Sequence, residues 1–169
     1  AAVARLRGWS DDTIVVNVQG DEPFVPPSLI DQAAALLQRD PCASIATLAT
    51  PIASLAEFFD LNVVKVVAAD DGTALYFSRA PVPWSRDGAP AGLASQAEFR
   101  GALRHVGLYA YTVAALARIT ALPPSSLELC EKLEQLRALQ AGLRIVVGIC
   151  VEAPGPGIDT EHDLRHARE

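Results

Sequence analysis

Several features are scarce in this sequence of 169 residues, and each scarcity excludes a class of protein. Cysteine occurs three times, at widely spaced positions in apolar stretches: Cys42, Cys130 and Cys150. An odd, scattered set of this kind argues against both a disulfide framework and a Cys-x-x-Cys metal site. Positive charge is also sparse, because 14 Lys and Arg stand against 20 Asp and Glu, for a formal net charge of -6. We therefore expect no nucleic-acid partner.

Long apolar runs are missing as well. Although 50% of the residues are hydrophobic, no run approaches the roughly 18 to 20 residues that a membrane-spanning helix needs. The start, AAVARLRGWS, lacks the apolar core of a signal peptide. These observations predict a cytoplasmic protein with no membrane partner. The patterns G-x-G-x-x-G, G-x-x-x-x-G-K-S/T and G-x-S-x-G are also absent, which argues against dinucleotide-binding, P-loop and serine-hydrolase classes.

The remaining pattern alternates strands and helices, as in an α/β domain. Residues 13–18 are a β-branched apolar run typical of a strand covered on both faces, and Ser28 is expected to cap the helix that follows. Helices are also expected between residue 123 and about 141 and, capped by Thr160, at the C-terminus. Further strands are expected over residues 44–49, 63–67, 74–79, 103–112 and 144–151. The length suits one domain, residues 1–169.

Two carboxylates follow predicted strands. Asp21, in VQGDEP, comes directly after the first strand, at an edge where open α/β sheets bind ligands. Asp159 follows the last strand and the turn PGPG. If the two edges face one another, the pair would suit Mg²⁺, which takes one or two protein carboxylates plus substrate phosphates. The structural alternative makes Asp21 a turn residue and Asp159 the start of a helix.

Cationic and aromatic residues lie in or after other strands. Arg79, Arg104 and His105 could donate hydrogen bonds to a sugar carboxylate, for which the arginine fork is well suited. His105 and Tyr109 are four apart in an alternating strand, so they share a face and could line one pocket. The alternative is that both are core residues at the edge of the sheet, with satisfied polar tips.

Polar residues on the predicted helices have plainer explanations. Glu134 and Gln135 lie beside an apolar helical stripe and are of the kind that is ordinarily solvated. His162 and His166 have the spacing of a metal pair, but they stand among charged residues on a short helix that we expect to be solvated.

Six strings occur in order along the chain: DDTIVVNVQGDEP, NVVKVV, ALYFSRAPVPW, RHVGLYAY, LEQLRAL and PGPGIDTEHDL. Together they resemble the 3-deoxy-manno-octulosonate (Kdo) cytidylyltransferase family, which acts in lipopolysaccharide synthesis. VQGDEP alone would be only suggestive, since related sugar-acid cytidylyltransferases carry similar segments. RHVGLYAY together with LEQLR narrows the resemblance to the cytidylyltransferases that act on Kdo.

The resemblance implies an α/β fold like that of nucleotide-diphospho-sugar transferases, with a mixed sheet flanked by helices. It implies a Mg²⁺-dependent reaction in which CTP and Kdo give CMP-Kdo and pyrophosphate, and we expect a homodimer formed through the region 80–112. Asp21 and Asp159 would hold magnesium for catalysis, and Gln19 would lie beside the sugar and the nucleotide. The residues that would contact Kdo are Arg79, His105, Tyr109, Glu134 and Gln135.

One family feature has no counterpart in the sequence. Members begin with a strand and a glycine-containing loop whose Arg and Lys grip the CTP triphosphate, and here nothing precedes Ala1 to supply it. AAVARLRG also reads as the end of a helix, so we expect a domain incomplete at its N-terminus that lacks the nucleotide loop. Two alternatives stay open: a sialic-acid type of cytidylyltransferase, and a non-catalytic fragment that folds and binds sugar.

Overall fold

The computed structural model describes residues 1–155, 157–158, 161–166 and 168. In this part of the chain, the strands form a six-stranded mixed sheet in the order β4-β3-β5-β2-β6, with β1 also paired to β5. The β2–β6 pair is parallel and the other pairs are antiparallel. The strands are β1 (Ile14–Val18), β2 (Ile45–Pro51), β3 (Lys65–Ala68), β4 (Ala74–Ser78), β5 (Leu103–Thr112) and β6 (Ile145–Ile149).

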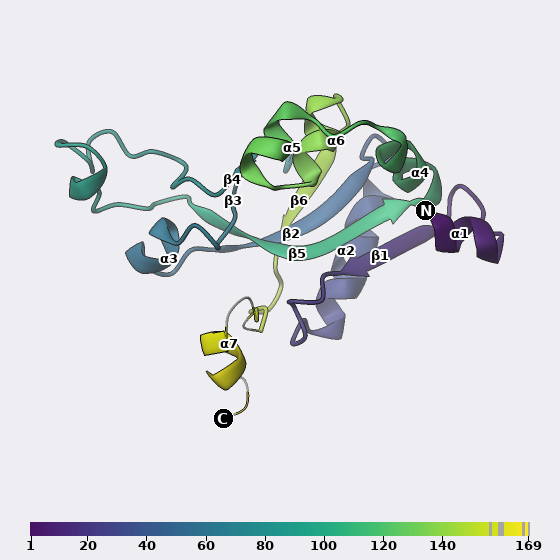
Figure 1. Cartoon of the computed structure of the whole chain (residues 1–169), viewed down its shortest axis with the longest axis horizontal. Coiled ribbons are helices and arrows are strands. Elements are labelled where there is room, and N and C mark those ends of the chain that lie inside the picture. The colour runs from purple at the N-terminus through teal and green to yellow at the C-terminus, as the bar shows by residue number, and fades with distance from the viewer. Residues whose placement is uncertain (156, 159–160, 167, 169) are drawn as a thin grey trace.

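Helices cover both faces of this sheet, with α2 behind it and α4, α5 and α6 on the opposite side (Figure 1). The mixed α/β sheet flanked by helices confirms the predicted fold class. The helices are α1 (Ala2–Arg7), α2 (Pro27–Arg39), α3 (Leu55–Phe59), α4 (Val113–Ala121), α5 (Ser126–Glu131), α6 (Gln135–Gln140) and α7 (Glu161–His166), with a 3-10 turn at Leu93–Ser95.

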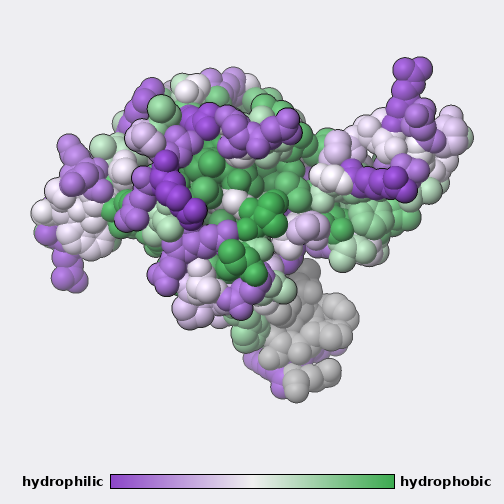
Figure 2. Space-filling model, turned by 180° about the vertical axis from the view of Figure 1, so that it is seen from behind, coloured by the Kyte–Doolittle hydropathy of each residue, from purple (hydrophilic) through white to green (hydrophobic). Residues whose placement is uncertain are grey.

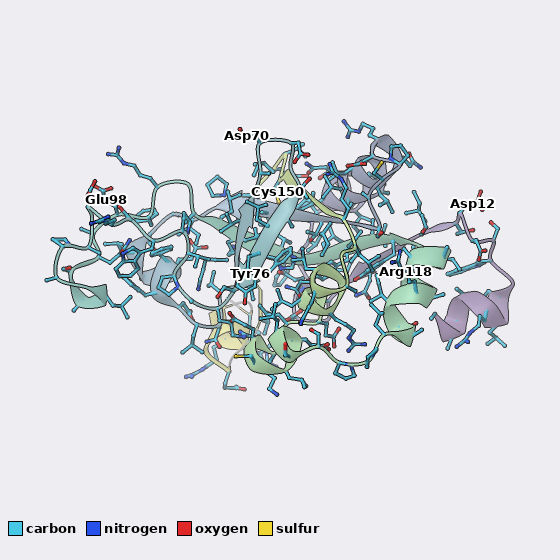
Figure 3. The ribbon with its side chains drawn as sticks, turned by 90° about the horizontal axis from the view of Figure 1, so that it is seen from above. Asp12, Asp70, Tyr76, Glu98, Arg118 and Cys150 are labelled. Atoms are coloured by element: carbon cyan, nitrogen blue, oxygen red, sulfur yellow. The ribbon has the colours of Figure 1, made fainter. Side chains whose placement is uncertain are left out.

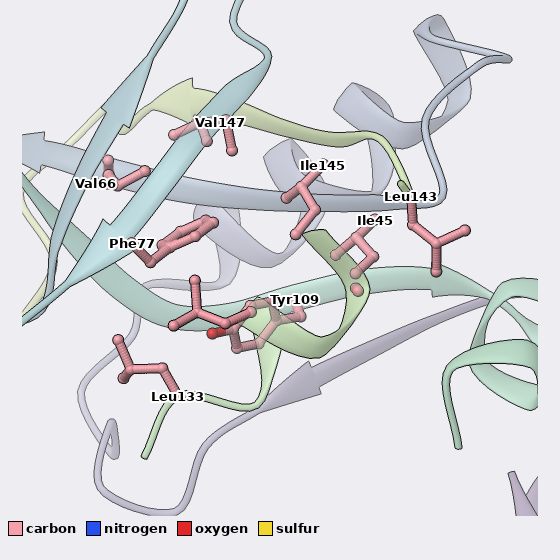
Figure 4. Close-up of a cluster of buried hydrophobic side chains, with 12 residues drawn as sticks. Ile45, Val66, Phe77, Tyr109, Leu133, Leu143, Ile145 and Val147 are labelled. Carbon is pink, nitrogen blue, oxygen red and sulfur yellow. The ribbon is translucent and has the colours of Figure 1, made fainter. Parts of the chain in front are cut away.

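The central strand β2 supplies both layers of the core. Its side chains alternate, so that Ile45 and Ala49 enter the core on the α6 side, while Ala46 and Leu48 enter the core under α2. All four are almost completely buried. Figure 4 shows the first layer, in which Ile45 lies with Phe77 and other apolar side chains beneath α6.

Strand directions bring two chain segments to one edge of the sheet. Strands β1 and β2 are each antiparallel to β5, and β6 is parallel to β2, so β1, β2 and β6 run in the same direction. Their carboxyl ends therefore lie at the same edge. Strands β3 and β1 both pair with the edge of β5 that β2 does not occupy: β3 with residues 103–104 and β1 with residues 108–112. Between them, residues 105–107 of β5 pair with neither strand.

Two local predictions are wrong. The residues of β1 are half-buried or exposed, not covered on both faces, because one face packs on the core under α2, through Ile14 and Val16, and the other borders a cavity. The helix predicted to follow Ser28 begins at Pro27, where the fixed φ of proline suits the first helical turn. The Ser28 hydroxyl instead donates to the carboxylate of Glu152. The predicted cap Thr160 lies outside the described residues.

Two helices were not predicted, and both are started by side-chain caps. The backbone N–H of Glu57 donates to Ser54 Oγ at the start of α3, and that of Ala115 donates to Thr112 Oγ1 at the start of α4. These hydroxyls satisfy amides that have no partner inside the helix.

Residues 79–102, which we call the arm, extend away from the sheet (Figure 1). Glu98 in the arm and Asp12 after α1 lie at opposite ends of the molecule (Figure 3). Seen from behind, the surface gathers hydrophobic residues near its middle, with hydrophilic residues around them (Figure 2). Among the described helices, none combines the length and the apolar character that crossing a bilayer would take.

Candidate functional site

A cavity of about 1260 Å³ opens beside residues 105–107 of β5, on the side of the sheet that α4 and α6 cover. Its walls come from the β1 turn, strand β5, the segment around α3 and the start of α6. Asp159 lies outside the described residues. The side chains of His162 and His166 also lie outside the described part of the chain. The other candidate binding residues all line this one cavity: Gln19, Asp21, Arg79, Arg104, His105, Tyr109, Glu134 and Gln135.

The turn after β1 forms one wall. The amide of Gln19 donates to the carbonyl of Gly107 over 2.9 Å, and the amide of Gly107 donates to Glu22 Oε1 over 3.2 Å. A side chain at Gly107 would force neighbouring side chains to move, because an added Cβ would lie 2.4 Å from Gln19 Oε1 and 3.1 Å from Glu22 Cγ. The same turn carries the exposed side chain of Asp21 to the wall of the cavity.

The segment after β6 returns to this same turn. The amide of Ile158 donates to the carbonyl oxygen of Asp21 over 2.7 Å, and Gly157 lines the cavity. Gly155 packs so closely on Phe24 that an added Cβ would lie 2.3 Å from the Phe24 Cβ. The shared direction of β1 and β6 explains why two segments so far apart in sequence meet here.

Arg79 lines another part of the cavity, where backbone carbonyls fix its guanidinium. Its Nε donates to the carbonyl of Glu131 and its Nη1 donates to the carbonyl of Leu61, each over 2.9 Å. The carboxylate of Glu131 in turn accepts from the Arg79 amide and from Ser78 Oγ. The guanidinium is therefore oriented before any ligand binds, which lowers the entropic cost of holding an anion.

Two further cations lie near Arg79. Arg104 Nε is 3.3 Å from Glu57 Oε1 but is not aligned for a hydrogen bond with it. Lys65 is completely buried, and its Nζ donates to the carbonyls of Asp60 and Val63. Burial lowers the pKa of Lys65, with nearby Asp60 opposing that shift. Lys65 thus holds the loop before β3, whereas Arg79 and Arg104 line the cavity and can donate to an anionic group such as a carboxylate.

His105 and Tyr109 share one face of β5, as their spacing predicted. Their ring centroids are 5.1 Å apart, and Phe77 meets the His105 ring edge-on at 5.2 Å. Burial lowers the pKa of His105 to about 3, and burial also raises the pKa of Tyr109 well above 10. Both rings are neutral at pH 7, so they offer hydrogen bonds to the cavity without adding charge.

We expect acid to weaken the fold through His105. Its pKa is about 3 in the folded protein and 6.5 in an open chain, so in this window the unfolded state binds the extra proton. Stability is therefore complete above pH 6.5 and is lost as pH falls toward 3, by up to about 1.4 kcal/mol per pH unit.

Urea denaturation at pH 7 and pH 5 tests this expectation. The parent should lose about 2 kcal/mol more than a His105→Gln variant between these two pH values. Carboxylates such as Asp40 and Glu128, whose pKa values are lowered by arginine partners, contribute equally to both proteins. Equal losses in the two proteins would show that His105 does not resist protonation.

Glu134 and Gln135 lie where the chain breaks between helices α5 and α6. Helix α5 ends at Glu131, the next residue Lys132 is in the left-handed conformation with φ 57°, and α6 begins at Gln135. Gln135 is buried with 8% of its surface exposed, whereas Glu134 is exposed. Both line the cavity, so Gln135 is not the solvated surface residue that its position in the sequence suggests.

Several residues that shape the site were missed by sequence reasoning. The Thr47 hydroxyl holds His105, the Lys65 ammonium holds the loop before β3, and Glu131 holds Arg79. Thr47 and Glu131 act through contacts between segments distant in sequence, which no local pattern reveals, whereas Lys65 bonds to carbonyls two and five residues before it. A single signal was available, since a lysine inside the apolar run NVVKVV requires buried partners.

Comparison with known proteins shows which family this sequence resembles. Residues 1–145 match the sequence model of a family described as cytidylyltransferase. A 3-deoxy-manno-octulosonate cytidylyltransferase of Thioalkalivibrio sulfidiphilus is 47% identical over 169 residues, which cover 100% of this chain and 67% of the relative. One of Xanthomonas campestris pv. campestris is 49% identical over 168 residues, covering 99% and 67% of the two chains. The chain thus spans about two thirds of these relatives.

Solved structures show the same fold. A CMP:2-keto-3-deoxy-manno-octonic acid synthetase complexed with CTP is similar with a TM-score of 0.80 and 37% identity, over 98% of this chain and 64% of that one. A 4-diphosphocytidyl-2C-methyl-D-erythritol synthase shares the fold at 13% identity and a TM-score of 0.55, over 99% and 60% of the two chains.

Proposed function

The chain belongs to the cytidylyltransferase family, and from that premise we propose that its protein transfers the cytidylyl group of CTP to Kdo, giving CMP-Kdo and pyrophosphate. One observation carries the proposal: a single cavity is lined by the Arg79 guanidinium, which backbone carbonyls orient, and by the Asp21 carboxylate. The guanidinium suits the sugar carboxylate, and the Asp21 carboxylate suits a metal ion that carries phosphate.

The reaction is an in-line displacement at phosphorus. The anomeric hydroxyl oxygen of Kdo forms a bond to the α-phosphorus of CTP, the bond from that phosphorus to the bridging oxygen breaks, and pyrophosphate leaves with the electron pair. The hydroxyl proton passes to solvent. No covalent intermediate with the protein is needed, so the residues of the cavity act by orienting the sugar and neutralising charge.

We assign magnesium to Asp21 and Asp159. Bound there, Mg²⁺ would neutralise the charge on the phosphates and polarise the attacking hydroxyl. The hydrogen bond between Ile158 and Asp21 supports the pairing, because Asp159 is the next residue in the sequence. Among the described residues no group of three acidic, histidine or cysteine side chains forms a metal cage. Magnesium takes few protein carboxylates and keeps waters and substrate oxygens, so two carboxylates would be enough to hold it.

We propose that the sugar binds between Arg79 and Asp21. The Arg79 guanidinium would bind the carboxylate of Kdo, and Gln19, beside Asp21, would contact both sugar and nucleotide. Hydroxyls of the eight-carbon chain would meet the remaining polar groups that line this part of the cavity: His105, Tyr109, Glu134 and Gln135.

Product formation by the full-length protein tests this function directly. With CTP, Mg²⁺ and Kdo we expect CMP-Kdo and one equivalent of pyrophosphate, and with sialic acid in place of Kdo we expect a kcat/KM lower by about 100-fold or more. A higher kcat/KM for sialic acid than for Kdo would show that the substrate is a sugar acid other than Kdo. Absence of any cytidylyl transfer, with the sugar still bound in calorimetry, would favour a non-catalytic sugar-binding protein.

We also propose a cytoplasmic homodimer. Trp84 and Leu93 of the arm are 46% and 56% exposed, and a second copy of the chain would cover them. All three cysteines are free, which suits a reducing compartment.

Light scattering tests the dimer and should give twice the subunit mass. Trp84→Asp should shift that mass toward the monomer, and a parent that is monomeric at assay concentrations would refute the dimer.

A further inference from the structure

Thr47, at the centre of β2, is a completely buried polar residue whose hydroxyl joins two groups of β5. Thr47 Oγ1 lies 2.7 Å from the carbonyl oxygen of Leu108 and 2.9 Å from Nε2 of His105. The register between the two strands shifts at Thr47/Leu48, where Gly107 and Leu108 have no partner residue on β2. The hydroxyl therefore sits at an irregularity of the sheet that directly borders the cavity.

Counting protons fixes the state of the histidine. A hydroxyl carries one proton, and a carbonyl oxygen can only accept, so Thr47 donates its proton to Leu108. Its oxygen must then accept from His105, which puts a proton on Nε2. The low pKa that burial gives His105 means that the ring carries no second proton at pH 7. Nδ1 is left with a lone pair.

We propose that Thr47 is a positioning residue: its hydroxyl holds His105 as the neutral tautomer protonated on Nε2, so that Nδ1 accepts a hydrogen bond from a hydroxyl of the sugar. The inference rests on the proposed function for the identity of the ligand, and on the geometry alone for the tautomer. It replaces the donor role toward a carboxylate that the sequence suggested for His105. A lone pair repels carboxylate and phosphate oxygens, so His105 selects hydroxyl groups and leaves the anion to Arg79.

Nitrogen NMR of the ligand-free full-length protein, labelled in histidine, tests the tautomer without any substrate. The chain has three histidines, and a His105→Gln variant identifies the His105 signals by their loss. At pH 7 we expect a bonded proton on Nε2 and a lone pair on Nδ1. A proton on Nδ1, or rapid exchange of the proton between the two nitrogens, would overturn the role of Thr47.

Steady-state kinetics separate positioning from a merely structural role. Thr47→Val keeps the shape of the side chain and removes the hydroxyl, whereas Thr47→Ser keeps the hydroxyl. We expect Thr47→Val to raise KM for Kdo about 10-fold or more, with kcat and KM for CTP changed by less than about threefold. Thr47→Ser should restore the KM for Kdo to within about threefold of the parent.

Other outcomes overturn distinct parts of the inference. A fall in kcat with an unchanged KM for Kdo, or equal effects of the two substitutions, would make Thr47 a structural residue only. A parent that forms no CMP-Kdo would overturn the proposed function and the ligand named here. An active parent with the wrong histidine tautomer would overturn the role of Thr47 alone.

Discussion

Replacing Asp21 by asparagine is expected to slow CMP-Kdo formation by the full-length protein by about 100-fold or more, because metal assistance to phosphoryl transfer is worth several kcal/mol. The substitution keeps the size of the side chain but removes the negative charge that a hard divalent cation requires. Higher Mg²⁺ concentration should restore part of the rate, since the lesion is weaker metal binding. Initial rates of pyrophosphate release at several Mg²⁺ concentrations measure both effects.

The fold should tolerate this change. The Asp21 side chain is exposed, and the contact that ties its segment to Ile158 uses its backbone carbonyl, so the free energy of unfolding should change by less than about 0.5 kcal/mol. Asp70→Asn is a matched control, because Asp70 is an exposed carboxylate in the turn after β3 and does not line the cavity (Figure 3). The control should keep the parent rate. Retention of more than about a tenth of the rate by Asp21→Asn would refute the metal role.

Truncating Phe77 to alanine is expected to lower the free energy of unfolding by about 3 to 5 kcal/mol. Its ring is completely buried in the layer between the sheet and α6, and it also packs edge-on against His105 (Figure 4). Alanine would leave a cavity that the surrounding strands can fill only in part. Urea denaturation monitored by circular dichroism gives the difference from the parent.

Leu75→Ala supplies the comparison within the same strand. Leu75 lies two residues before Phe77 on β4 but is 58% exposed, so its truncation should cost about 1 kcal/mol or less. If the two substitutions cost the same, the ring of Phe77 is not part of a close-packed core. The KM for Kdo of Phe77→Ala should also rise, since the edge contact that orients His105 is lost.

Local patterns in the sequence were sufficient to predict most of the strands. Runs such as TIVVNV and ALYFSR are β-branched or aromatic and are bounded by turn residues, and the strands form where those runs lie. The burial of β1 was predicted wrongly, because the apolar pattern does not tell which face of a strand borders an open cavity. Helix α4 was missed since its apolar sequence continues directly from β5.

Part of the candidate site could likewise be predicted from the sequence and part could not. Asp21 and the His105–Tyr109 pair could be identified from their own strands, because position at a strand end and even spacing along a strand are local properties. The tautomer of His105 and the orientation of Arg79 depend on Thr47 and Glu131, which come from other parts of the chain. Such contacts follow from tertiary packing, which the sequence of one segment does not contain.

The many roles of β5 have a consequence for how the specificity of this scaffold can change. One strand pairs with β1, β2 and β3 and also carries Arg104, His105, Gly107 and Tyr109 to the cavity. A substitution there that altered substrate choice would risk disturbing the strand pairings around it, since Arg104 pairs with β2 and β3 and Tyr109 pairs with β1 and β2. Evolution or engineering toward a new acid sugar is therefore expected to proceed through exposed positions such as Glu134, whose replacement leaves the sheet intact.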